Sequence, residues 1–333
     1  MVVAVEKLIE DYKLTSLGWQ SQNLRIVNKR SETVSLVHNV AQLKVYNAMM
    51  LQIKHNLPVM LLVYKARQRG ISTYIEACIF ERINRRQNRH GCIASMDQIS
   101  TEKVFRMCQT FHEELPDKLK RPTDRASAKE ILYKAPWRSS MLCQTAGKTV
   151  LGRGGTTQYV HGTEVAFWAN AKTQLLGLLQ EVPEEPDTIV VLETTANGPG
   201  GAFSEDYWAA VRRLRKNPHD YRGYLPIFLS WQDEIEYQTP LPRGSKEPPN
   251  MTPEMNEYLK EGAAMGVTLS PEQVFFALLK IQNKCGGDYD LFKQEYPRTA
   301  REAERSTGRM VFKTINLDTV SYTHLTLPTT PYV

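Results

Sequence analysis

The sequence predicts an α/β protein whose mostly parallel sheet is covered by helices on both faces, with a small helical subdomain appended. Between residue 59 and about residue 230, short β-rich runs alternate with helical patterns. Runs such as IVVL at residues 189–192 are continuously apolar, which is typical of parallel strands that are buried on both faces. The length of 333 residues is enough for roughly two domains.

The elements follow in order along the chain. The first 57 residues are expected to be helical in part, and an amphipathic helix is expected to begin at Asn39. A proline- and glycine-rich stretch at 239–253 predicts a linker or surface loop. Strands are predicted at 59–64, 92–95, 131–134, 141–145, 158–162, 188–194 and 225–229, and helices at 72–88, 101–115, 171–181, 204–216, 253–262 and 270–283.

Composition narrows the class of protein. Hydrophobic content of 41% and charged content of 23% are ordinary for a soluble globular chain. Five scattered cysteines without C-x-x-C spacing predict reduced thiols in a cytosolic protein and no zinc site. No apolar run approaches the roughly 18 residues of a membrane span, and the N-terminus lacks a signal-peptide layout. The net charge of +6 favours a polyanion partner, although basic clusters at helix ends can also simply face solvent.

Residues 59–73, VMLLVYKARQRGIST, have the strand–loop–helix layout of a phosphate-binding loop. Backbone N–H groups of such a turn, together with the positive end of the following helix, hold nucleotide phosphates. Compared with G-x-x-x-x-G-K-[ST], the loop keeps Gly70 and Ser72 but has Lys65 at the first glycine and Ile71 at the lysine. A basic turn without any ligand is the alternative. The candidate nucleotide-binding residues are Lys65, Arg67, Gln68, Arg69, Gly70, Ser72 and Thr73.

Two further strand ends carry polar groups. The run 158–162 is followed by Thr163 and Glu164, and a carboxylate there can orient and deprotonate an attacking water. Aspartate usually precedes that glutamate and holds Mg²⁺, whereas Thr163 can serve only as a neutral ligand. Alternatively, Glu164 is a solvated strand end. The strand 188–194 leads into a hydroxyl- and amide-rich turn suited to sensing a γ-phosphate, or forming only a turn, with Thr194, Thr195, Asn197 and Gly198.

Four segments together resemble the ATPase portion of the large terminase subunit of tailed bacteriophages, over roughly residues 36–312. They are KARQRGIST, HGTEVAFW, LETTANGPGGAF and KQEYPRTAREAE. The resemblance implies a P-loop NTPase-type fold, ATP and Mg²⁺ as cofactors, and an ATPase that drives double-stranded DNA into a preformed capsid. It also implies a homo-oligomeric ring on the portal protein, a small terminase subunit as partner, and a location in the host cytoplasm.

The same resemblance assigns roles to individual residues. Gln42 matches the glutamine that recognises adenine, and Lys65 matches a shifted phosphate-loop lysine. Glu164 matches the catalytic glutamate and, with Ser72, the metal side of the site. Residues 194–198 match the motif that couples hydrolysis to movement. Arg153, in the sequence GRGG, resembles an arginine finger offered to a neighbouring subunit.

The resemblance also sets the expected domains. They are a helical segment with the adenine-recognition motif at 1–57, the ATPase core at 58–230, and a linker with a small helical subdomain at 231–312. Family members continue into a nuclease domain starting about where Met310 stands, so endonuclease activity is expected only of a full-length member. Residues 313–333 are expected to be an artificial tail of a truncated reading frame, or else a natural disordered terminus, because residues 321–333 show neither helical nor strand periodicity.

Two other functions remain open from the sequence. A helicase-type ATPase would need a second large α/β domain, and residues 230–312 are too short and too helical for one. Because Ile71 and Thr163 depart from the usual signatures, a catalytically inactive nucleotide- or DNA-binding module is the other alternative.

Overall fold

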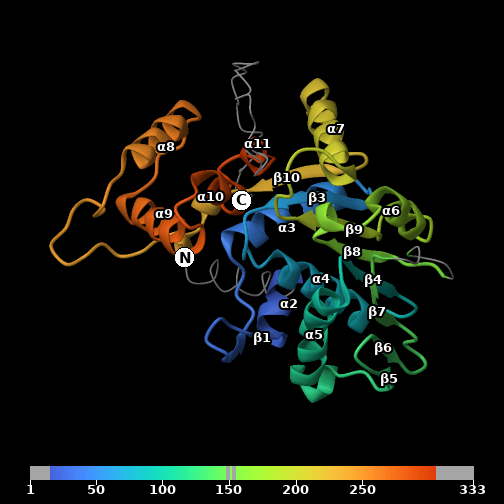
Figure 1. The fold of residues 1–333 in the computed structure, drawn as a ribbon. Coiled ribbons are helices and arrows are strands. Elements are labelled where there is room, and N and C mark those ends of the chain that lie inside the picture. The colour runs from blue at the N-terminus through green and yellow to red at the C-terminus, as the bar shows by residue number, and fades with distance from the viewer. Residues whose placement is uncertain (1–15, 148–150, 152–154, 305–333) are drawn as a thin grey trace, which may run out of the picture. The chain divides into compact units, whose positions relative to one another are not determined.

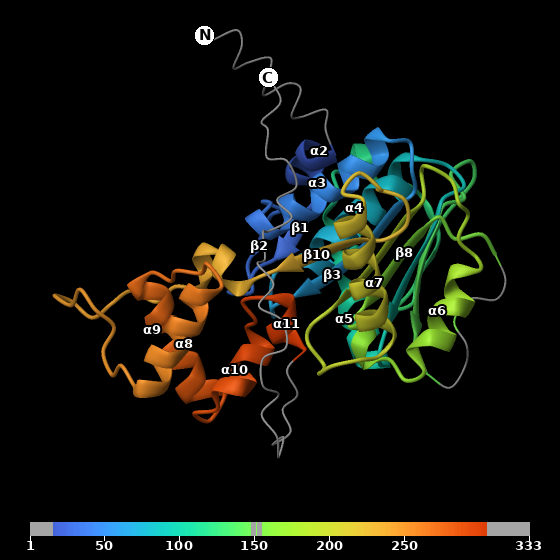
Figure 2. The same cartoon turned by 90° about the horizontal axis from the view of Figure 1, so that it is seen from above.

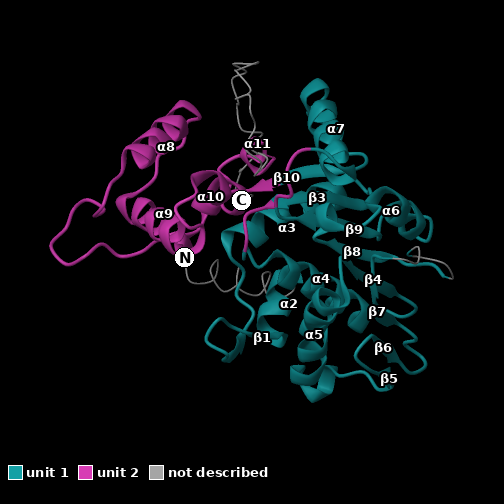
Figure 3. Ribbon diagram, viewed as in Figure 1, with its two compact units in different colours: residues 1–64, 68–195, 200–227 teal, residues 65–67, 196–199, 228–333 magenta. Residues whose placement is uncertain are grey.

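The computed structural model describes residues 16–147, 151 and 155–304 of the chain, which form two compact units (Figure 3). Unit 1 contains the described residues of 16–64, 68–195 and 200–227, and unit 2 contains 65–67, 196–199 and the described residues from 228 onward. The described residues 16–57 therefore belong to the same unit as the sheet.

An eight-stranded sheet dominates the fold, in the strand order β10-β3-β9-β8-β4-β7-β6-β5 (Figure 1). The adjacent strands β3, β9, β8, β4 and β7 pair in parallel. At one edge, β6 pairs antiparallel with both β7 and β5. The predicted mostly parallel α/β sheet is confirmed. The strands are β3 (Val59–Lys65), β4 (His90–Ser95), β5 (Thr123–Ala126), β6 (Glu130–Tyr133), β7 (Ser140–Thr145), β8 (Tyr159–Thr163), β9 (Ile189–Thr194) and β10 (Leu225–Leu229).

The helices of unit 1 cover both faces of this sheet. His161 and Gly162 are successive residues of β8, so their side-chain positions point to opposite faces. His161 meets helix α4, whereas a Cβ on Gly162 would meet Trp168, beside the short helix η2 (Val165–Phe167). The helices are α2 (Ser16–Asn23), α3 (Val40–Lys54), α4 (Ile71–Arg85), α5 (Gln98–Glu114), α6 (Ala171–Leu179) and α7 (Ala202–Lys216).

Unit 1 differs from the sequence-based expectations at several places, including strand β5, which was not predicted. A hairpin of β1 (Arg25–Val27) and β2 (Thr33–Ser35) precedes α3, and each of its strands has only three residues. Helix α5 begins three residues earlier than predicted, because the Asp97 carboxylate accepts a hydrogen bond from the Ser100 N–H at 2.8 Å. Helix α4 ends at Arg85, before Asn88 adopts a left-handed conformation with φ of 54°.

Unit 2 is a small helical subdomain with its own aromatic core. It contains α8 (Pro253–Ala264), α9 (Pro271–Lys284), α10 (Tyr289–Glu295) and α11 (Ala300–Ala303) (Figure 2). Trp231 is fully buried, with its ring stacked on Phe276 and edge-on to Phe292. A buried ion pair between Arg298 and Glu302 adjoins this core, and the Arg298 guanidinium lies 3.7 Å from the Tyr258 ring centroid. The described part of this unit is helical and contains no second sheet.

Candidate nucleotide and catalytic site

The end of the predicted phosphate loop is held by the start of helix α3. Gly70 has a φ of 68° and caps the N-terminus of α4, so it offers no side chain to the first N–H groups of that helix. The side-chain amides of Asn39 and Gln42 donate to the carbonyls of Arg69 at 3.2 Å and Gly70 at 2.8 Å. A Cβ at residue 70 would lie 3.0 Å from the Gln42 Nε2 atom. The helix end therefore keeps uncapped N–H groups at a fixed loop, as anion binding requires.

Gln42 has a second structural task at this point. Its Oε1 accepts from the Asn39 N–H at 2.9 Å, and the Asn39 side chain accepts from the Gln42 N–H at 2.9 Å, which together form a capping box. Gln42 is buried. The residue predicted to recognise adenine is thus bonded directly to the loop that was predicted to bind phosphates.

The segment that leads into α3 contains a half-buried histidine whose charge opposes folding. His38 Nε2 lies 2.9 Å from Gln20 Oε1, and its Nδ1 lies 3.2 Å from Ser21 Oγ. Burial lowers the pKa of His38 to about 4. The neutral imidazole is therefore the form that the folded protein accommodates near physiological pH.

This pKa predicts a loss of stability in mild acid. Because the folded pKa lies below the unfolded value of about 6.5, the contribution of His38 is present above pH 6.5 and is lost as the pH falls toward 4. Replacing it in His38→Gln should flatten the fall in unfolding free energy between pH 7 and pH 4.5, measured by urea denaturation. Parallel curves for the two proteins would show that His38 does not contribute to this dependence.

The other predicted loop residues are placed as follows. Lys65 ends β3 and is buried. In unit 2, the Arg67 side chain forms an ion pair with Glu295, and the Arg67 carbonyl accepts from the Tyr237 hydroxyl at 2.5 Å. Within unit 1, Gln68 has a φ of 59° and Arg69 is only 1% exposed. The Thr73 hydroxyl is 3.5 Å from the sulfur of Met107 on α5, so its side chain points toward that helix.

Three oxygen-bearing side chains meet where β8 and β9 end beside the start of α4. Ser72 donates a hydrogen bond to Glu193 Oε1, and Thr163 donates to the same oxygen at 2.9 Å. Glu193 is fully buried and pairs with Thr163 in the parallel register between β9 and β8. Ser72 was predicted as a site residue and Thr163 as a neutral ligand, whereas Glu193 was not predicted.

Behind Glu193, a second buried carboxylate and a histidine complete a polar chain. His161 Nδ1 is hydrogen-bonded to Glu76 of α4, and His161 Nε2 lies 3.3 Å from Glu193 Oε1. Burial alone lowers the pKa of His161, but the two carboxylates outweigh it and raise that pKa to about 9. The imidazolium therefore compensates buried negative charge. Cys108 Sγ, at 3.2 Å from Glu76 Oε2, closes the far end of this chain.

Glu164 stands one residue beyond β8 in the left-handed conformation, with φ of 53°. Its Oε2 accepts from the Thr195 N–H at 3.0 Å and from the Thr195 hydroxyl at 2.8 Å. A non-glycine residue in this region is uncommon, and here it turns the carboxylate toward the end of β9. The structure therefore brings the predicted base together with a predicted coupling residue.

The remaining predicted coupling residues lie along the turn after β9. Thr194 Oγ1 accepts from the Ala166 N–H at 3.3 Å and donates to the Thr195 carbonyl at 2.9 Å. Asn197 and Gly198 belong to unit 2, and Gly198 has a φ of 73°. This left-handed backbone is favoured by glycine, so Gly198 has a conformational reason to occupy its position.

The donor set at the strand ends suits a hard divalent cation. The hydroxyls of Ser72 and Thr163 and the carboxylates of Glu193 and Glu164 offer only oxygen atoms, which Mg²⁺ prefers. In the described residues, no group of three or more His, Cys, Asp or Glu side chains is arranged to hold a metal by itself.

Arg153, the predicted arginine finger, lies outside the described residues. The described residues beside it are anchored, because Gln174 of α6 donates to the Gly147 carbonyl at 2.6 Å and accepts from the Leu151 N–H at 2.9 Å. Both Gln174 and Leu151 are buried. Met310, where a nuclease domain was expected to begin, and the tail at 313–333 are also outside the described part of the chain.

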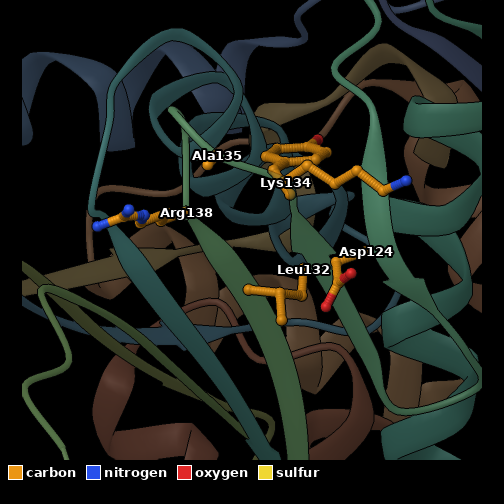
Figure 4. A pocket seen from close by; sticks show the side chains of 6 residues that line it. Asp124, Leu132, Lys134, Ala135 and Arg138 are labelled. Carbon is orange, nitrogen blue, oxygen red and sulfur yellow. The ribbon is translucent and has the colours of Figure 1, made fainter.

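A separate pocket lies at the antiparallel edge of the sheet (Figure 4). None of the residues discussed above lines it, so we do not assign it to the nucleotide site. It is lined by Asp124, Leu132, Tyr133, Lys134, Ala135 and Arg138.

Comparison of the fold with solved structures identifies similar proteins. The crystal structure of the large terminase of bacteriophage HK97 matches with a TM-score of 0.52 and 13% identity, over 85% of this chain and 53% of that chain. The large terminase of the thermophilic bacteriophage D6E matches with a TM-score of 0.45 and 9% identity, over 69% of this chain and 50% of that one. The ATPase domain of the Thermus phage P74-26 large terminase gives a TM-score of 0.43 and 16% identity, over 79% and 93%.

The HK97 match shows that this chain has the fold of that part of a large terminase, and the chain spans about half the length of the HK97 protein. No protein-family model matches the sequence. No curated protein matches it at a significant level either. The predicted terminase-like fold is therefore confirmed by structure rather than by sequence.

Proposed function

We propose that this chain is the ATP-hydrolysing motor portion of a phage large terminase subunit, which translocates double-stranded DNA into the procapsid. The observation that carries the proposal is the meeting of the Ser72 and Thr163 hydroxyls on Glu193, with Glu164 directly after Thr163, at the carboxyl edge of a parallel sheet with a terminase-like fold. Ligands of open α/β sheets bind outside the carboxyl ends of the strands. The nucleotide would be ATP, with Mg²⁺ as its cation.

The proposed roles follow the chemistry of each group. The N–H groups at the start of α4 bind phosphate, with Lys65, Arg67 or Arg69 as the cation that replaces the lysine absent at Ile71. Gln42 joins adenine recognition to the loop through its bond to Gly70. The remaining loop residues, Gln68 and Thr73, contribute backbone at the phosphates.

Hydrolysis itself requires a water aligned with the γ-phosphate. Glu164 orients this water and accepts its proton, while Thr195 holds the carboxylate in place. Ser72 would hold Mg²⁺, whose charge would neutralise the phosphate oxygens. Arg153 would act on the γ-phosphate of a neighbouring subunit, and residues 194, 195, 197 and 198 would transmit hydrolysis to movement.

The partners are proposed on the same basis. A motor that moves any sequence should contact mainly DNA phosphates, with little base readout. Several basic side chains already have acidic neighbours: Arg86 and Arg89 pair with Asp187, and Arg125 pairs with Glu130. No helix in the described residues is long and apolar enough to cross a membrane. We propose a ring of copies on the portal protein, a small terminase subunit as partner, and action in the host cytoplasm.

The direct test is ATP turnover by the purified chain, measured as phosphate release with and without double-stranded DNA. We expect Mg²⁺-dependent hydrolysis that DNA stimulates. Binding of nucleotide without turnover, even at high protein concentration and with DNA, would indicate an inactive binding module. Endonuclease activity is proposed only for a longer chain.

A further inference from the structure

The residue immediately before the proposed base Glu164 carries no charge. Aspartate is usual immediately before the catalytic glutamate, where it supports Mg²⁺, and this chain has Thr163 instead. A threonine hydroxyl contributes a neutral oxygen and no negative charge. The site therefore needs a carboxylate from elsewhere if its metal side is to keep the usual charge.

Glu193 occupies the position from which that charge can act. It pairs with Thr163 across β8 and β9, and both side chains lie on the α4 face of the sheet. One oxygen of Glu193 accepts hydrogen bonds from the hydroxyls of both Ser72 and Thr163. A hydroxyl that ligates a cation through its oxygen must direct its proton elsewhere, and a carboxylate is the strongest acceptor for it. The arrangement leaves oxygen lone pairs of both hydroxyls for a metal.

The buried carboxylate of Glu193 is stabilised by the His161 imidazole and not by solvent. Both Glu193 and His161 are fully buried, and Glu76 contacts the other imidazole nitrogen. An outer partner that bonds metal-binding groups directly, as Glu193 bonds the two hydroxyls, orients them, and its loss weakens metal affinity by roughly 10- to 100-fold. The contact between Ser72 and Glu193 could not be read from the sequence, because the two residues are 121 positions apart.

We propose that Glu193, placed on β9, takes over the task of the carboxylate absent at Thr163: it orients the hydroxyls of Ser72 and Thr163 toward Mg²⁺ and supplies the negative charge. This inference rests on the proposed function. Glu193 is a positioning residue in this scheme, since it acts through two hydroxyls.

The experiment measures the affinity of the protein for a fluorescent ADP analogue with Mg²⁺ and with EDTA. For the unmodified protein we expect Mg²⁺ to tighten binding. In Glu193→Gln, the gain from Mg²⁺ should shrink by roughly 10- to 100-fold, while affinity in EDTA stays near that of the unmodified protein. An undiminished gain in the variant would overturn the inference, as would binding by the unmodified protein that does not depend on Mg²⁺. Failure of the unmodified protein to bind nucleotide at all would instead contradict the proposed function.

Two further variants separate positioning from general damage. Glu76→Gln removes the other buried carboxylate of His161 without touching either hydroxyl, and it should keep most of the Mg²⁺ gain; an equal loss in this variant would overturn the assignment. Thr163→Asp combined with Glu193→Gln returns a carboxylate to the usual place and should restore the gain. If Glu193→Gln fails to fold by circular dichroism, Glu193→Asp keeps the charge but withdraws it by one methylene, and an unchanged Mg²⁺ gain there would count against the proposal.

Discussion

Glu164→Gln is expected to lower ATP turnover by about 10²-fold or more while nucleotide still binds. The amide keeps the size of the side chain and can still accept from the Thr195 N–H and hydroxyl, which hold Glu164 Oε2 at 3.0 and 2.8 Å. It cannot accept a proton from water. Turnover is measured as phosphate release, and binding as the change in fluorescence of an ADP analogue.

Thr195→Val is the matched control for this prediction. It removes the hydroxyl bond to Glu164 but keeps the backbone N–H bond, so only the orientation of the base is weakened. Loss of one such bond costs about 1 kcal/mol, and turnover should fall by no more than about tenfold. If Glu164→Gln hydrolysed ATP at the unmodified rate, Glu164 would be a polar strand end without a catalytic part.

Arg153→Ala is expected to reduce turnover by on the order of 10³- to 10⁵-fold, the range measured for arginine fingers. We propose that Arg153 acts on a neighbouring subunit, so turnover of the unmodified protein should rise more than linearly with its concentration. The chain near it is fixed on α6 through the two bonds of Gln174 to Gly147 and Leu151.

Mixing two inactive proteins tests this action between subunits. Arg153→Ala protein retains Glu164, and Glu164→Gln protein retains Arg153, so a mixed interface contains one complete site. Recovery of turnover on mixing is the expected result. No recovery, under conditions where sedimentation shows that the subunits associate, would rule out action in trans.

The fold was predictable because its strands are apolar and its turns carry distinctive residues. The apolar residues of β9 and β3 are continuous. That pattern predicts strands and also predicts that they lie inside a parallel sheet. The hairpin before α3 was not predictable, because a strand of three residues is too short to show an alternation of apolar and polar side chains. The edge strand β5, TDRA, was not predicted either, because it has almost no apolar side chains.

The candidate site was predictable only where a motif preserves its order along the chain. Glu164 follows β8 directly, and Ser72 stands in the first turn of the helix that follows β3, so each has a defined place at the carboxyl edge of the sheet. The chain of Glu76, His161 and Glu193 depends on which strands are neighbours, which no local pattern encodes. A signal was present nonetheless, since a carboxylate inside an apolar strand and a histidine inside another are costly unless they are paired.

The strand order has a consequence for how the halves of the site communicate. Strand β9 lies between β3, which leads to Ser72, and β8, which leads to Glu164. With neighbouring strands about 4.8 Å apart, those two strands are separated by roughly 10 Å, too far for a short side chain to cross. Glu193 touches Ser72, and Thr195, two residues later, touches Glu164. A shift of this single strand end by a fraction of an ångström would thus reach both the proposed phosphate side and the proposed water side, so a change in one would alter the other.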